Sequence, residues 1–88
     1  MMTLERFKQN CLEHEDFTDD DRELVEVTQG ARYFCYSSAT KIIKYDFKAS
    51  QWLARGIPKG IFQWEWHVAD SLETALRAKQ DRYDYVYP

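Results

Sequence analysis

The sequence predicts an α+β fold, in which a small and mostly antiparallel sheet of four or five strands packs against an N-terminal helix and a C-terminal helix over about residues 71–80. Large apolar side chains alternate with polar ones from Ile61 to Val68, which is the period of a half-buried strand. Apolar side chains also recur at helical spacing near the N-terminus and again after Asp70. Three Trp, six Tyr and five Phe supply a core without disulfides, so we expect one compact domain over residues 1–88.

The first 21 residues predict one helix followed by a loop. Thr3 is placed to cap the helix. The side chains that share one side of this helix are Leu4, Phe7, Cys11 and His14. Residues 13–21 carry one aromatic, Phe17, and a Thr-Asp-Asp-Asp run, which is typical of an exposed loop or of the cap of another short helix. We expect this stretch to be mostly loop.

A hairpin is predicted next, because β-branched and aromatic residues flank Gln29-Gly30 between residues 23 and 36. Gly30 would supply the positive φ of a tight turn. The following residues, 37–56, fit two patterns. One is a strand over 41–47 and a short helix over 49–55, ended by Gly56 and Pro58, and the other is one long helix. We favour the strand and short helix.

The last third of the chain is predicted to form a strand, a helix and a second strand. The side chains of the first strand that we expect to face inward together are Phe62, Trp64, Trp66 and Val68. Asp70 is placed to cap the helix, with Glu73 in capping-box register. Residues 83–87 alternate Tyr with Asp and Val, as in a strand. If both strands lie in one sheet, a right-handed crossover would make them parallel.

Charge is strongly segregated along the chain, although the net charge is only −3. Residues 13–26 hold eight carboxylates against Arg22 alone, for a net charge of −7. The basic excess lies at 41–59, where Asp46 is the only carboxylate. The basic residues of this stretch are Lys41, Lys44, Lys48, Arg55 and Lys59. Such asymmetry is typical of proteins that act through a charged surface.

No residue pattern indicates catalysis or a bound metal. The only Cys and His residues are Cys11, His14, Cys35 and His67, and they lack the paired spacing of zinc modules, so buried free cysteines are favoured. No Cys or Ser stands beside a base as a catalytic nucleophile would. The carboxylates at 19–23 lack the EF-hand spacing and its glycine. We therefore expect a non-enzymatic protein without catalytic residues, metal or cofactor.

The composition also bears on the cellular setting. Two cysteines are too few for a disulfide framework, and no basic region followed by an apolar run opens the sequence. No apolar run approaches the ~18 residues that span a bilayer. We expect a cytoplasmic chain that does not enter the membrane. An unpaired edge in so small a sheet also makes a homodimer plausible.

Residues 49–64 offer an alternative function. Leu53-Ala54-x-Gly56-Ile57-Pro58 resembles the turn of a helix-turn-helix motif and lies in the basic stretch. The resemblance implies DNA reading by a helix after the turn. The alternation at Phe62–Val68 favours a strand there, so nucleic-acid binding by 41–59 stays the second hypothesis.

The favoured hypothesis is a small protein-binding module that presents its acidic 13–26 surface to a basic partner, such as a nucleic-acid-binding protein. The residues expected to contact the partner are Asp19, Asp20, Asp21, Glu23 and Glu26. The alternative is that the acidic run only solvates a loop, or pairs within the fold with Lys41, Lys44 and Lys48. In size and composition the chain is similar to phage and mobile-element accessory proteins, including inhibitors of bacterial defence such as anti-CRISPR proteins. That similarity is an analogy, and no residue motif carries it.

Overall fold

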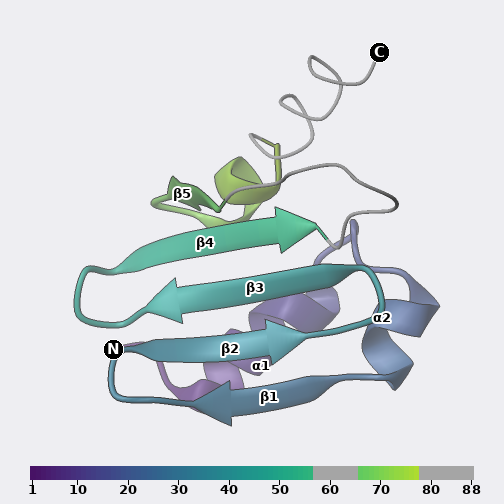
Figure 1. Cartoon of the computed structure of the whole chain (residues 1–88), viewed down its shortest axis with the longest axis horizontal. Coiled ribbons are helices and arrows are strands. Elements are labelled where there is room, and N and C mark those ends of the chain that lie inside the picture. Colours follow the sequence, from purple (N-terminus) through teal and green to yellow (C-terminus); the bar gives the residue numbers. More distant parts are fainter. Residues whose placement is uncertain (57–65, 78–88) are drawn as a thin grey trace.

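The protein is a five-stranded antiparallel sheet with helices packed on one face, as a computed structural model that describes residues 1–56 and 66–77 shows (Figure 1). The strands follow one another across the sheet in the order β1-β2-β3-β4-β5. The predicted α+β class is therefore confirmed. No helix in these two ranges is long and apolar enough to cross a membrane.

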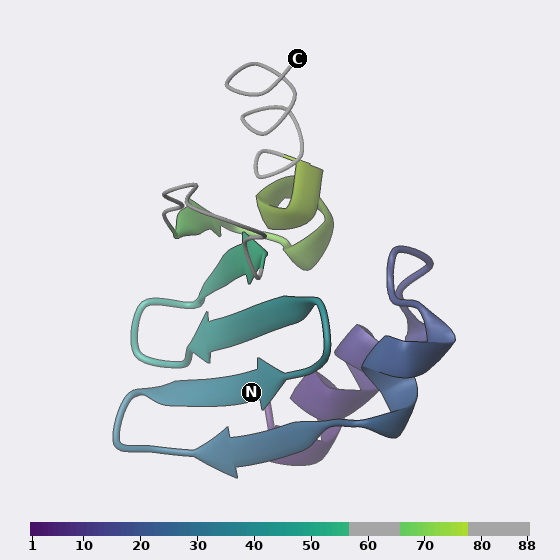
Figure 2. The same ribbon diagram turned by 45° about the vertical axis from the view of Figure 1, so that its right-hand side comes forward.

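Helix α1, Leu4–Glu13, covers the sheet behind β1 and β2 (Figure 2). Its cap is the predicted one, since the Thr3 hydroxyl accepts a hydrogen bond from the Arg6 N–H at 3.2 Å. Phe7 and Cys11 are the buried residues of this helix. Residues 13–21 are only partly the expected loop, because a second helix, α2, spans Asp19–Glu23. Thr18 and Asp21 form a capping box that starts it.

Strands β1, Glu26–Gln29, and β2, Tyr33–Ser37, form the predicted hairpin. The Gly30 N–H donates to the Tyr33 carbonyl at 2.9 Å, which leaves Ala31 and Arg32 as the central turn residues. Gly30 thus precedes the turn centre, and it does not adopt the left-handed φ that we expected of it.

Strands β3, Lys41–Asp46, and β4, Gln51–Gly56, form a second hairpin. The strand predicted over 41–47 is confirmed, whereas the short helix over 49–55 and the single long helix are both wrong. The Asp46 carboxylate accepts bonds from the Lys48 and Ala49 N–H groups at 3.0 and 2.9 Å, and Ser50 takes a positive φ of 55°. These two features turn the chain back along β3. With a strand at 51–56, the first helix of a helix-turn-helix motif is absent.

Strand β5, His67–Ala69, confirms the end of the strand predicted over 61–68. Its register corrects the predicted facing: Ala69 lies opposite Trp52 of the core, whereas Val68 lies opposite Leu53 and is 53% exposed. Val68 therefore points away from the helices, and the Trp66 ring lies on the same far face, next to Lys44 and Arg55. Phe62 and Trp64 lie outside the described residues.

A C-terminal helix is present from Leu72 to the end of the described segment at residue 77. Its apolar stripe is the predicted one, with Leu72, Ala75 and Leu76 buried. Its first turn is capped by Ser71 and not by Asp70, since the Ser71 hydroxyl accepts from the Thr74 N–H at 3.1 Å. Residues 78–80 and the last strand predicted at 83–87, with its parallel crossover, lie outside the described residues.

The core lies between the helices and the inner face of the sheet. The Phe7 ring centre is 5.7 Å from that of Phe34 and 5.6 Å from that of Trp52, so α1 is fixed to β2 and β4. Phe17, just before α2, meets the Tyr36 ring edge-on at 5.4 Å. Within the part of the chain that the structure describes, the buried apolar residues are Phe7, Cys11, Phe17, Phe34, Tyr36, Ile43, Trp52, Ala54, Leu72, Ala75 and Leu76.

Candidate functional site

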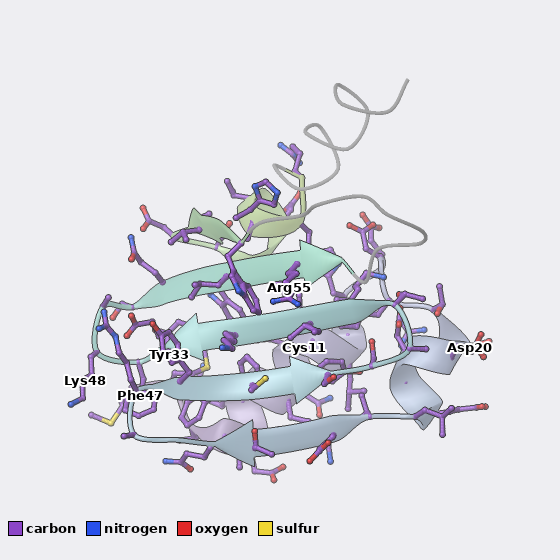
Figure 3. The ribbon with its side chains drawn as sticks, in the orientation of Figure 1. Cys11, Asp20, Tyr33, Phe47, Lys48 and Arg55 are labelled. Carbon is purple, nitrogen blue, oxygen red and sulfur yellow. The ribbon has the colours of Figure 1, made fainter. Side chains whose placement is uncertain are left out.

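The acidic stretch is placed mainly on α2 and at the start of β1, at one end of the sheet (Figure 1). The Asp19 side chain is 96% exposed, and it forms a loose ion pair of 3.6 Å with Arg22. Asp20 projects from α2 into solvent (Figure 3). Glu23 and Glu26 are also exposed. These four carboxylates, Asp19, Asp20, Glu23 and Glu26, are called the acidic surface below.

Asp21 belongs to the interior and not to the acidic surface. It is 0% exposed, and its Oδ1 accepts from the hydroxyls of Ser38 at 2.8 Å and Thr40 at 2.7 Å. Its Oδ2 accepts from Lys41 Nζ at 2.9 Å and from the Thr18 N–H at 3.1 Å. A partner cannot reach a carboxylate enclosed in this way, so Asp21 is corrected from a contact residue to a structural one.

These hydrogen bonds also control the ionisation of Asp21. Burial alone would raise the pKa of this carboxyl group, because it disfavours the charged form. Hydrogen bonds from Thr40, Lys41, Ser38 and the Thr18 N–H together outweigh burial and hold the pKa well below its usual range. Asp21 is therefore charged in the folded protein and ties α2 to the β2–β3 turn.

The sequence held one signal for the role of Asp21. Thr18-x-x-Asp21 has the spacing of a capping box, which predicts that the Asp21 side chain turns back toward the helix start. Its pairing with Lys41 joins residues 20 positions apart in the sequence. That contact confirms, for Asp21 and Lys41, the alternative in which the acidic run pairs within the fold, although no local pattern could show which carboxylate is involved.

Leu24 is exposed among the carboxylates of the acidic surface, and no sequence pattern predicted this exposure. Leu24 ends α2 as its C-cap, between Glu23 and the first residue of β1, and is 74% exposed. It borders a shallow hollow of about 430 Å³, whose other lining residues are Val25, Glu26, Ser37, Ser38 and Ala39. Single exposed apolar side chains are common on protein surfaces, so Leu24 is of interest only together with the carboxylates and the hollow beside it.

The basic stretch 41–59 is divided between the interior and the far face of the sheet. Lys41 is buried against Asp21, and its ammonium also lies 5.0 Å from the centre of the Phe17 ring. Lys44 lies on the far face, 5.2 Å from the Tyr33 ring centre and 4.9 Å from that of Trp66. Lys48 is exposed at the end of the sheet opposite Asp20 (Figure 3). Lys59 lies outside the described residues.

The cysteines are separated by the sheet. Cys11 is buried under the inner face, where burial first and the nearby Cys35 second raise its pKa to about 12. Cys35 is half-buried on β2, and burial raises its pKa as well. Both thiols are free and are poor nucleophiles at neutral pH. Within residues 1–56 and 66–77, no group of three His, Cys, Asp or Glu side chains is placed to hold a metal ion.

Comparison with known proteins finds no family model, no curated protein and no solved structure that matches this chain. The site must therefore be interpreted from its own chemistry.

Proposed function

We propose that this chain is a small, non-enzymatic protein-binding module whose acidic surface recognises a basic segment of another protein. The observation that carries the proposal is the exposed acidic surface of α2 and the start of β1, with the Leu24 side chain exposed between Glu23 and Glu26. Charged groups at the rim of an interface steer the encounter, whereas an apolar side chain near its centre contributes contact energy. Leu24 and its carboxylate neighbours supply both parts.

The chemistry of the surface defines the class of partner. Clustered carboxylates attract surfaces rich in Lys and Arg, and such surfaces are built to hold phosphates in proteins that handle nucleic acid. A module that occupies a phosphate-binding surface would act as an inhibitor. An anti-defence protein of phages or mobile elements, of the anti-CRISPR kind, is one member of this class, and a cytoplasmic setting fits it.

Charge reversal on the acidic surface tests the proposal. The double variant Asp20→Lys, Glu23→Lys is compared with the control Glu5→Lys, Glu73→Lys, which changes the net charge equally at exposed positions elsewhere. The partner is captured from a lysate of the source organism and quantified by mass spectrometry. The first variant should recover at least about tenfold less partner than the parent protein, and the control should recover an unchanged amount, because interface charges govern encounter and orientation. Both variants should fold, since surface substitutions usually change stability by about 0.5 kcal/mol or less.

Undiminished capture of the partner by both variants would contradict the proposal. A loss shared by both variants would show that only total charge matters and would count against a defined acidic surface. Circular dichroism and a urea midpoint measured on the same samples exclude unfolding as the cause of any loss.

A second candidate function, nucleic-acid binding, draws on one observation. Lys44 lies over the rings of both Tyr33 and Trp66 on the sheet face away from α1, and single-strand binders combine cations with aromatic platforms in this way. Fluorescence polarisation with a single-stranded oligonucleotide at low salt tests it. Affinity should fall linearly on a log–log plot as salt rises, and Lys44→Gln should reduce that slope by about 0.7 if the cation neutralises one phosphate. No binding by the parent protein at low salt would exclude this function.

A further inference from the structure

Strand β1 is the border of the sheet next to the acidic surface. It pairs with β2 on one side, and in Figures 1 and 2 no described segment lies beyond its other side. An outer strand of this kind presents unpaired N–H and C=O groups along its free edge. These groups offer the main-chain hydrogen bonds that an added strand would need.

The hydrogen-bond pattern identifies which residues of β1 present their backbone outward. The Gly30 N–H bonds to the Tyr33 carbonyl, so these two residues form a hydrogen-bonded pair at the end of the hairpin. Such pairs alternate with non-bonded ones in an antiparallel ladder. The pair of Thr28 and Cys35 is therefore bonded, whereas Val27 and Gln29 direct their N–H and C=O groups to the free edge.

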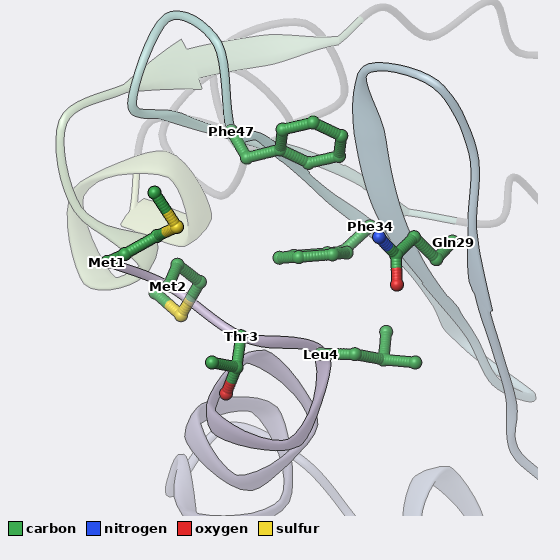
Figure 4. A pocket seen from close by; sticks show the side chains of 7 residues that line it. All are labelled: Met1, Met2, Thr3, Leu4, Gln29, Phe34 and Phe47. Atoms are coloured by element: carbon green, nitrogen blue, oxygen red, sulfur yellow. The ribbon is translucent and has the colours of Figure 1, made fainter.

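The edge has a hollow at each end. The shallow hollow beside Leu24 lies at the Glu26 end. At the Gln29 end is a pocket of about 380 Å³, which Figure 4 shows between the N-terminal residues and the hairpin strands. Its lining is mostly apolar and consists of Met1, Met2, Thr3, Leu4, Gln29, Phe34 and Phe47. Four residues of β1 separate the two ends, roughly 10 Å of strand.

We propose that the free edge of β1 accepts an extended basic segment of the partner as an added strand. The segment would bond to the outward groups of Val27 and Gln29, place a Lys or Arg near Glu26, and seat an apolar side chain in the pocket of Figure 4. Main-chain bonds supply affinity in this mode, and side-chain pockets supply specificity. This inference rests on the proposed function and specifies how the acidic surface engages its partner.

Charge complementarity selects this occupant over a second copy of the chain. A copy paired antiparallel through its own β1 would set Glu26 of each chain near the Gln29 end of the other, so the interface would gather four carboxylates, Glu23 and Glu26 from each chain, and accumulated negative charge opposes association. A nucleic acid would meet the same repulsion. A Lys- or Arg-bearing strand meets attraction instead.

A synthetic peptide of about seven alternating lysines and valines, long enough to cover β1, is the probe. Two variants at one position separate the contribution of the backbone N–H to binding from that of the side chain. Gln29→Pro removes the outward N–H and leaves the bonds of β1 to β2 in place, whereas Gln29→Ala removes only the side chain. In a fluorescence titration, Gln29→Pro should weaken binding by about tenfold or more, and Gln29→Ala by less than about twofold.

Amide hydrogen exchange measured by NMR gives a second readout. At saturating peptide, the Val27 and Gln29 amides of the parent protein should exchange about tenfold more slowly, because they become hydrogen-bonded. A peptide with glutamate in place of lysine should give neither effect. If the parent protein binds the peptide without any protection of these amides, and the variant Asp20→Lys, Glu23→Lys does not bind it, the added strand would be overturned while the acidic surface would be supported. No binding of the lysine peptide would also overturn the inference, and the capture experiment would then decide the proposed function separately.

Discussion

Replacement of Asp21 by alanine is expected to lower the free energy of unfolding by about 3–5 kcal/mol, because it leaves the Lys41 ammonium buried without its carboxylate. The variant also loses the capping box with Thr18 and the bonds from Ser38 and Thr40. A domain of this size is stable by roughly 5–10 kcal/mol, so the variant should be near the limit of folding. Urea denaturation followed by circular dichroism measures the effect.

Asp20→Ala is the matched control for this result, because Asp20 is exposed on the same helix. Its effect should stay within about 0.5 kcal/mol. Similar urea midpoints for the two alanine variants would contradict the structural role assigned to Asp21.

The same residue predicts how stability depends on pH. The pKa of Asp21 is lower in the folded protein than in the unfolded chain, where it is about 3.9. Its contribution is therefore complete above that value and is lost as pH falls toward the folded pKa. Asp46 acts in the same window: burial raises its pKa, but bonds from the Ala49 N–H, Arg32 and the Lys48 N–H lower it overall. The informative quantity is thus the difference in the free energy of unfolding between the parent protein and Asp21→Asn. This difference should become smaller below about pH 4.

Phe7→Ala is the second change with a large expected effect, about 3–5 kcal/mol of lost stability. Phe7 is 0% exposed and is the residue of α1 whose ring packs on both Phe34 and Trp52. Its removal leaves a cavity between α1 and the sheet, and closely packed surroundings refill such cavities only in part. The melting temperature should fall by roughly 4–8 °C for each kcal/mol.

Leu24→Ala serves as the control, because the side chain it shortens is largely in solvent. This variant should keep its stability within about 0.5 kcal/mol. A Phe7→Ala protein as stable as Leu24→Ala would mean that α1 does not depend on its aromatic contacts with the sheet.

Elements with strong local signals were predictable from the sequence. Helix α1 was predicted from Thr3 and from an apolar side that includes Phe7 and Cys11, all within one short segment. The first hairpin was predicted from β-branched and aromatic runs on both sides of Gly30. In each case the decisive interactions connect residues close in sequence.

Strand β4 shows why the next segment was not predictable. Residues 49–55 fit helical spacing, but Trp52 and Ala54 alternate toward the core because β3 pairs with them, through Tyr45 and Ile43. The partner strand overrides the local preference. For Val68, alternation correctly indicated a strand but not which face of it packs on the helices, since both faces of this sheet carry apolar side chains.

The candidate site was also predictable only in part, because its arrangement depends on contacts between residues far apart in the sequence. A run of carboxylates indicates an acidic region, and the capping-box spacing of Thr18 and Asp21 marks one of its members as a helix cap. That Asp21 is also buried follows from its tertiary contacts with Ser38, Thr40 and Lys41, which no local pattern shows. The exposure of Leu24 likewise follows from how α2 enters β1.

The bond between Asp21 and Lys41 has a consequence for recognition. This bond holds α2 against the turn before Lys41, 20 residues later in the chain. The neighbouring Asp20 and Glu23 therefore project from a helix whose position is already fixed. A preorganised surface loses less conformational entropy on association than a mobile loop with the same charges. Under the proposed function, breaking this bond should weaken binding, because more conformational entropy would be lost on association, even though Asp21 is buried and is not itself a proposed contact residue.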